Sequence, residues 1–369
     1  MKSAIYAQLL TGRDWHARCK LDRMAKLKPI SLALQGGGAH GAFTWGVLDR
    51  LLECNLVDIK AITATSAGAM NALAMASGMA ENGVEGARAA LEFFWREVSR
   101  RSATLAVASP PTGMEAINPF TAWTPFSLAT VLANFASPYD LNPFDFNPLR
   151  DALEKSINFE AVAEGGIDLH VAATNVETGR VKIFTGQDIT LDAALASACL
   201  PQTFKAVEID GVPYWDGGYM GNPALFPLIY SDAPGDILLV LLNPLTREGT
   251  PKSAGAIQDR LNEISFNSAL VSELRAISFV RKLLDENWLA DRKRNEYRRI
   301  NLHAIRGGQA LCDLSLESKY DTRWSFLTQL RDTGRTYADT WLETCYPKVG
   351  KDNSVDVREE FLSFSSRND

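Results

Sequence analysis

The sequence predicts an α/β fold in which a mostly parallel sheet is covered by helices on both faces. Short apolar runs at 30–34 and 62–65 have the length of buried strands. Each is followed by a turn and then by a segment of helical composition, at 42–54 and 67–77. This alternation is typical of parallel sheets, whose strands are buried on both sides. Further strands are expected at 169–174, 181–184, 237–242 and 300–305, and a further helix at 84–101.

The rest of the pattern predicts how the chain is divided. From 257 to 284 apolar residues recur every three or four positions, which indicates an amphipathic helix that packs against the sheet. Residues 324–341 have the same spacing. We therefore expect an N-terminal extension, an α/β domain, a mainly helical C-terminal region packed on the core, and a flexible polar tail. Their expected bounds are 1–27, 28–246, 250–346 and 347–369.

Composition argues against several classes of function. The formal net charge is -6, whereas a protein that binds nucleic acid presents a net basic face to the phosphates. The five cysteines are widely spaced and form no C-x-x-C pair, which predicts reduced residues in a cytoplasmic protein. No stretch has the roughly 20 apolar residues of a membrane-spanning helix, and no signal-peptide core is found. We expect any membrane contact to be peripheral.

The segment 102–148 differs in composition from the rest of the chain. Its 47 residues include three charged side chains, seven prolines and seven aromatic residues. Such a stretch is either a buried insertion or a lid that presents apolar surface to a lipid. On the lid interpretation, one wall of a substrate pocket would be formed by Phe120, Trp123, Phe126, Phe135 and Tyr139.

A glycine-rich loop lies between the first expected strand and the first helix. Its sequence is Gly36-Gly37-Gly38-Ala39-His40-Gly41. Consecutive glycines let backbone N–H groups converge on one point, where they bind an anion. Neither a dinucleotide fingerprint nor a phosphate-binding Lys-Ser/Thr follows, so an oxyanion hole for acyl transfer is the other natural use. On its own, the run is explained equally well by a tight turn.

A second motif is the turn Ala64-Thr65-Ser66-Ala67-Gly68, between the second strand and its helix. It matches the small-x-Ser-x-Gly pattern of a nucleophile elbow, which places the serine hydroxyl at the positive end of the next helix. The alternative is a helix N-cap by Ser66.

The third motif, Asp216-Gly217-Gly218, follows an expected strand end. Asp-Gly-Gly alone is an ordinary turn sequence. A glycine loop, a serine elbow and Asp-Gly-Gly, each at a strand end of one α/β domain, form a much rarer combination.

These motifs together resemble the patatin-like phospholipase family, whose pattern is a G-G-G-x-R/K-G loop, G-x-S-x-G and D-G-A/G. The resemblance extends over about 30–242 and implies a three-layer α/β/α fold with a nucleophile elbow. It implies that Ser66 is the nucleophile and Asp216 the base. The implied oxyanion loop is Gly36, Gly37 and Gly38, supported by Gly41, Gly68, Gly217 and Gly218. Two departures are His40, where the family has Arg or Lys, and Ala64, where it has glycine; a neutral His40 would make the loop less electropositive.

A serine and aspartate dyad needs no histidine, and two of the four histidines, His170 and His303, lie in strand-like runs. Because an aspartate pKa near 3.9 is too low for an efficient base, burial must raise the pKa of Asp216, which predicts an apolar pocket. No metal-binding pattern is found. We expect no metal and no cofactor.

The resemblance implies a serine-dependent lipid acyl hydrolase, of phospholipase A or lysophospholipase type, acting on a lipid or acyl-ester substrate. One alternative is a carboxylesterase, thioesterase or intracellular polyester hydrolase. Another is a catalytically silent protein that binds lipid or a partner through the apolar insertion and the basic cluster at 292–299. Head group, acyl position, chain length and oligomeric state stay open.

Overall fold

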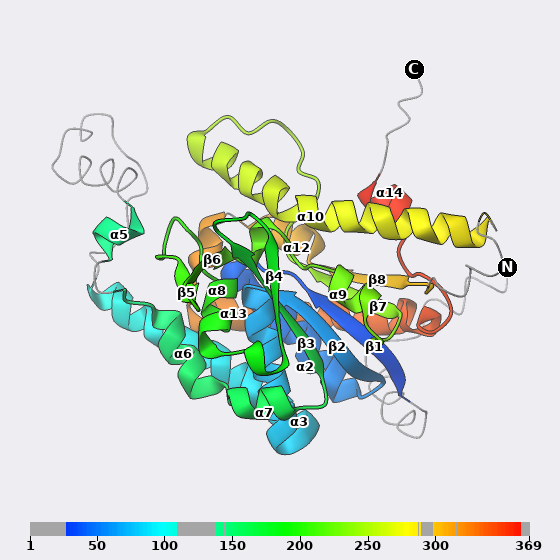
Figure 1. Ribbon diagram of the computed structural model, residues 1–369, viewed down its shortest axis with the longest axis horizontal. Helices are drawn as coiled ribbons and strands as arrows, with labels where there is room; N and C mark the ends of the chain where they lie inside the picture. The colour runs from blue at the N-terminus through cyan, green and yellow to red at the C-terminus, as the bar shows by residue number, and fades with distance from the viewer. Residues whose placement is uncertain are drawn as a thin grey trace.

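A central sheet organises the computed structural model, which describes residues 27–108, 137–142, 145–286, 288, 298–314 and 316–362 (Figure 1). The sheet has eight strands in the order β5-β6-β3-β2-β1-β7-β8, with β4 paired to β3. The strands are β1 (Lys28–Leu34), β2 (Val57–Thr65), β3 (Asp168–Asn175), β4 (Val181–Thr185), β5 (Val207–Ile209), β6 (Val212–Asp216), β7 (Asp236–Leu241) and β8 (Asn301–Arg306). Pairing from β3 through β2, β1 and β7 to β8 is parallel, whereas β4 and β6 run antiparallel to β3. The predicted mostly parallel sheet is confirmed.

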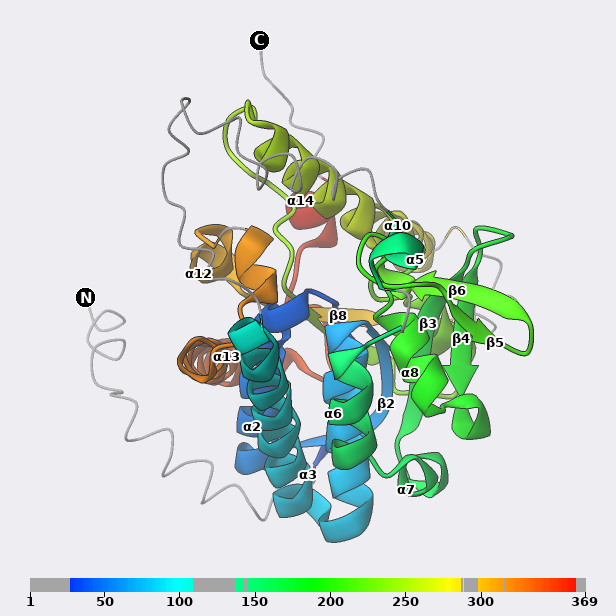
Figure 2. The same ribbon diagram turned by 90° about the vertical axis from the view of Figure 1, so that its left-hand side faces the viewer.

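Helices cover both faces of the sheet and make three layers (Figure 2). On one face lie α2 (Gly41–Cys54), α3 (Ala67–Ala108), α6 (Pro148–Ser156), α8 (Leu191–Ser197) and α13 (Trp324–Thr344). On the other face lie α9 (Phe226–Tyr230), α10 (Ala254–Asp285) and α14 (Val357–Phe361). The remaining helices are α5 (Pro138–Leu141), α7 (Phe159–Glu164), α12 (Gly308–Cys312), and the 3₁₀ helices η2 (Gly38–His40), η4 (Gly186–Asp188), η5 (Gly217–Tyr219), η6 (Leu316–Tyr320) and η7 (Tyr346–Lys348).

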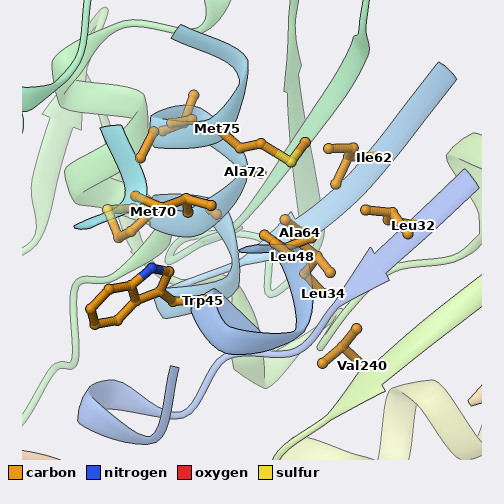
Figure 3. Packing of buried hydrophobic residues seen from close by; sticks show 14 of the residues in the cluster. Leu32, Leu34, Trp45, Leu48, Ile62, Ala64, Met70, Ala72, Met75 and Val240 are labelled. Carbon is orange, nitrogen blue, oxygen red and sulfur yellow. The ribbon is translucent and has the colours of Figure 1, made fainter. Parts of the chain in front are cut away.

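Each face of the sheet has its own hydrophobic core. On the α2 and α3 face, Leu34, Ile62 and Val240 from three neighbouring strands meet Leu48 and Met75 from the helices (Figure 3). The opposite core joins β7 to α10. Apolar residues on both sides of a strand explain why the central strands are continuous apolar runs in the sequence.

Helix α3 consists of two helices joined by a kink. Its backbone leaves the helical region at Asn82 and Gly83, and Gly83 has a φ of 61°, in the left-handed region that glycine adopts without strain. The kink explains why the sequence predicts two separate helices, at 67–77 and 84–101.

The C-terminal region is built into the fold. Strand β8 extends the sheet beside β7, and α13 packs so closely on α2 that a Cβ at Gly46 would lie 1.9 Å from the Arg331 carbonyl oxygen. The second half of α10 packs on the sheet through Leu270, Leu274 and Ile277, whereas Ile257, Leu261 and Ile264 in its first half are exposed, which differs from the expectation for the whole helix.

Part of the segment expected to be a flexible tail, 347–369, packs on the fold. After Pro347 the chain packs on the second core through Val355, Val357 and Phe361, which are all buried. These apolar residues are too widely spaced among polar ones to be recognised as a core segment in the sequence. Residues 363–369 lie outside the described part of the chain.

Candidate active site

Ser66 lies on the turn between β2 and α3, as the elbow motif predicts. Its φ is 53°, in the left-handed region that a non-glycine residue rarely adopts. The turn packs closely on β1, since a Cβ at Gly68 would lie 2.4 Å from the Leu34 carbonyl oxygen. The Ser66 amide donates a hydrogen bond of 2.9 Å to the Ser197 hydroxyl at the end of α8. These contacts hold the strained turn in place.

Asp216 ends β6 and lies beside the carboxyl half of β3. It pairs with Ala173, its amide donates to the Cys199 carbonyl at 2.8 Å, and its carbonyl accepts from the Thr174 hydroxyl at 2.8 Å. A Cβ at Gly217 would lie 2.2 Å from the Ala172 carbonyl oxygen, so only glycine fits after the aspartate. Strand pairing, two hydrogen bonds and the close packing at Gly217 therefore fix the position of the Asp216 backbone.

The environment of the Asp216 carboxyl makes it a stronger base. Burial, with 2% of the residue exposed, raises its pKa to about 6. Hydrogen bonds from the Gly218 amide, at 2.7 Å, and from the Ser66 hydroxyl partly offset this rise, as does the positive charge of Lys319. The interaction between the Ser66 hydroxyl and this carboxyl places the two predicted catalytic side chains near one another.

The glycine loop lines the same cavity. Its three backbone amides differ in whether they already donate a hydrogen bond within the protein. The Gly36 amide donates to Asn222 Oδ1 at 2.7 Å, and the Gly36 carbonyl accepts from Asn243 Nδ2 at 2.9 Å. Gly36 therefore anchors the loop, and its amide already has an acceptor in Asn222. Among the described residues, the amides of Gly37 and Gly38 donate to no acceptor.

A cavity of about 310 Å³ opens over these groups. Ser66, Asp216 and the glycine loop are among the residues that line it. Its apolar wall is formed by Met70, Phe94, Trp95, Val98, Leu149, Leu200, Phe204 and Phe266. Its polar wall contains Gln202, Asn262, Lys319, Tyr320 and Thr322. Most of these wall residues carry no local motif and are absent from the sequence-based site, because folding brings them together from separate helices and loops.

His40 and Ala64, the two residues that depart from the family pattern, lie in different surroundings. His40 is buried, with Nε2 2.6 Å from the Ser318 hydroxyl, and burial together with Lys319 and Arg247 lowers its pKa to about 3. It is neutral at physiological pH. Ala64 packs in the core with Leu48 (Figure 3) and does not line the cavity. Gly41 lies where a Cβ would be 2.7 Å from that of Ala67, so it allows α2 and α3 to approach.

The predicted aromatic wall is placed only in part. Phe120, Trp123, Phe126 and Phe135 lie outside the described residues, as does most of the basic cluster at 292–299. Tyr139 is exposed in α5, accepts a hydrogen bond of 3.3 Å from the Ala206 amide, and is not among the residues that line the cavity.

Two further histidines of the described residues lie in strands of the sheet, His170 in β3 and His303 in β8. His170 contacts Asp168 and His303 contacts Asp236, and neither histidine lines the cavity. Within the same residues, no group of three or more His, Cys, Asp or Glu could hold a metal ion. None of the helices described is both long and apolar enough to cross a bilayer.

This chain resembles known proteins in its sequence profile and in its structure. The sequence profile described as Patatin-like phospholipase matches residues 32–229, more than half of the chain. No curated protein matches. Solved structures with a similar fold include VipD from Legionella pneumophila (13% identity, 92% of this chain and 73% of that chain, TM-score 0.39). The ExoU-SpcU complex from Pseudomonas aeruginosa has 15% identity over 91% of this chain and 58% of that chain, with a TM-score of 0.38. On the profile match, the chain belongs to the patatin-like phospholipase family.

Proposed function

We propose that this chain is a serine-dependent lipid acyl hydrolase in which Ser66 is the nucleophile and Asp216 its base. One observation carries the proposal: the Ser66 hydroxyl interacts with a buried carboxylate whose pKa is raised, and both groups line the same largely apolar cavity. A helix N-cap or an ordinary turn requires none of these features.

The proposed reaction follows from the positions of these groups. Ser66 Oγ attacks the ester carbonyl carbon, and its proton passes to the Asp216 carboxylate. The carbonyl oxygen becomes an oxyanion, which the Gly37 and Gly38 amides stabilise. Collapse of the intermediate breaks the ester bond, and the proton on Asp216 goes to the leaving alcohol. Water then attacks the acyl-serine, with Asp216 again taking the proton and returning it to Ser66.

The shape and chemistry of the cavity support a long acyl chain as the substrate group. The residues of α3 that line the cavity are apolar, whereas Tyr320 and Thr322 add polar groups that suit a polar head group. We therefore propose a phospholipid or lysophospholipid as the substrate, rather than a soluble ester, thioester or polyester.

The test is an assay on p-nitrophenyl esters of increasing chain length and on mixed phospholipids. We expect Ser66→Ala and Asp216→Asn each to reduce kcat/KM by roughly 10³-fold or more, because a nucleophile and its base act as a unit. A fluorophosphonate probe is expected to label Ser66 alone, as peptide mapping would show. Near-normal turnover by Asp216→Asn, or labelling at another serine, would contradict the dyad. Preference for short soluble esters or for thioesters would contradict the lipid substrate.

A further inference from the structure

The oxyanion loop is covered by η6, a segment far outside the family match at 32–229. Gly38 has a φ of 59°, and a Cβ there would lie 2.5 Å from the Lys319 carbonyl oxygen. The neighbouring Ser318 hydroxyl contacts His40 Nε2 at 2.6 Å. The backbone of η6 therefore fits directly against the loop, and this contact fixes where the Lys319 side chain starts.

The Lys319 ammonium is tied to the loop through one buried amide. Lys319 Nζ donates to Asn243 Oδ1 at 2.6 Å, and Asn243 Nδ2 donates to the Gly36 carbonyl at 2.9 Å. Asn243 is 4% exposed, and its backbone N–H donates to Gln35 Oε1 at 2.8 Å. Because the backbone and the side chain of Asn243 are both held by hydrogen bonds, its side-chain oxygen gives the ammonium a defined position beside the loop.

Few other charged side chains of the described residues line this cavity. Among the described residues that line the cavity, Lys319 and Asp216 are the ones with a formal charge at neutral pH. His40 is held neutral, since burial and the nearby charges of Lys319 and Arg247 lower its pKa to about 3. Arg247 is itself paired with Glu263 at 2.7 Å.

We propose that Lys319 is a positioning residue for the reaction, whose ammonium makes the oxyanion loop electropositive where the negative charge of the tetrahedral intermediate develops. It supplies from the C-terminal region the charge that His40 does not carry. The ground-state ester is neutral, so a fixed positive charge stabilises the transition state more than the bound substrate. This inference rests on the proposed hydrolase function.

Lys319→Gln tests the charge separately from the tether, because a glutamine amide can still donate a hydrogen bond while carrying no charge. On a neutral short-chain p-nitrophenyl ester we expect kcat to fall by about 10- to 100-fold with KM changed less than about 2-fold. Lys319→Arg should restore most of the loss. Lys348→Met, on a 3₁₀ helix that does not line the cavity, is the matched control and should leave kcat unchanged.

The pH profile gives a readout that a purely structural role would not move. The Lys319 charge lowers the pKa of Asp216, so its loss should shift the acid limb of kcat/KM from about 6 to higher pH. Two other titratable groups face Asp216, the Tyr219 hydroxyl and the Cys199 thiol, and burial raises the pKa of both, so they stay neutral across this limb.

Three results would overturn the proposal: unchanged kcat in Lys319→Gln, a change confined to KM, or a loss seen only with phospholipids, which would make Lys319 a head-group contact. If Lys319→Gln unfolds, Lys319→Arg and Lys319→Met are compared instead, and equal kcat values in these two would overturn it equally. An inactive wild type indistinguishable from Ser66→Ala would refute the hydrolase function. An active wild type with an unaltered Lys319→Gln would refute only the role of Lys319.

Discussion

Asp216 shows how a residue suited to the proposed reaction can at the same time weaken the fold. Its folded-state pKa of about 6 lies above the ordinary 3.8 because its carboxyl is buried. Below pH 3.8 the carboxyl is neutral in both the folded and the unfolded state, so burial of charge costs nothing. As the pH rises through 6, the folded protein must hold a buried carboxylate, and stability is lost.

Asp216→Asn is therefore expected to be more stable than the wild type at neutral pH. Two pKa units correspond to at most about 3 kcal/mol in the free energy of unfolding at pH 7.5, and the gain should shrink below about 1 kcal/mol at pH 4. Urea unfolding at both pH values measures it, with the exposed Asp188→Asn as a control that should show no gain. An equal gain at both pH values would mean that buried charge is not its cause.

Among the elements, the second half of α3 determines the shape of the cavity. Phe94, Trp95 and Val98 face it from consecutive turns. The Trp95 indole N–H donates to Asn71 Oδ1 at 3.0 Å, and Asn71 Nδ2 donates to the Gly41 carbonyl at 3.0 Å. The wall is thus tied to the helix that follows the oxyanion loop, and its depth should set which acyl chains fit.

Val98→Phe should shorten the accepted acyl chain, because the added ring occupies part of the cavity. We expect kcat/KM for palmitoyl esters to fall, by about 4-fold for each excluded methylene at about 0.8 kcal/mol, while butyryl esters are hardly affected. Val84→Phe makes the same change in the same helix away from this cavity and should not alter the chain-length profile. An equal loss on short and long esters would show that Val98 does not contact the acyl chain.

On the scale of the whole molecule, local patterns predicted the sheet and the places of the two candidate catalytic side chains. Ser66 and Asp216 were found because each follows a strand end within a short motif, and their pairing needs only the sheet order. The same patterns could not reveal Ser197, Asn222 and Lys319. These residues make their contacts across the fold, with segments distant in the sequence, and no spacing rule marks such contacts. The anchoring role of Gly36 depends on the same long-range contacts.

The close fit of α13 on α2 implies that this molecule could work as a split enzyme. The break would fall between β7 and α10, and two glycine contacts would have to re-form across it, Gly46 with Arg331 and Gly38 with Lys319. Fragments 1–246 and 250–369 should each be inactive alone, since the first lacks the cover of its oxyanion loop and the second lacks Ser66 and Asp216. Co-expression should restore ester hydrolysis, and Gly46→Leu in the first fragment should abolish the restored activity by preventing reassembly. Full activity of fragment 1–246 alone would show instead that the C-terminal region is dispensable.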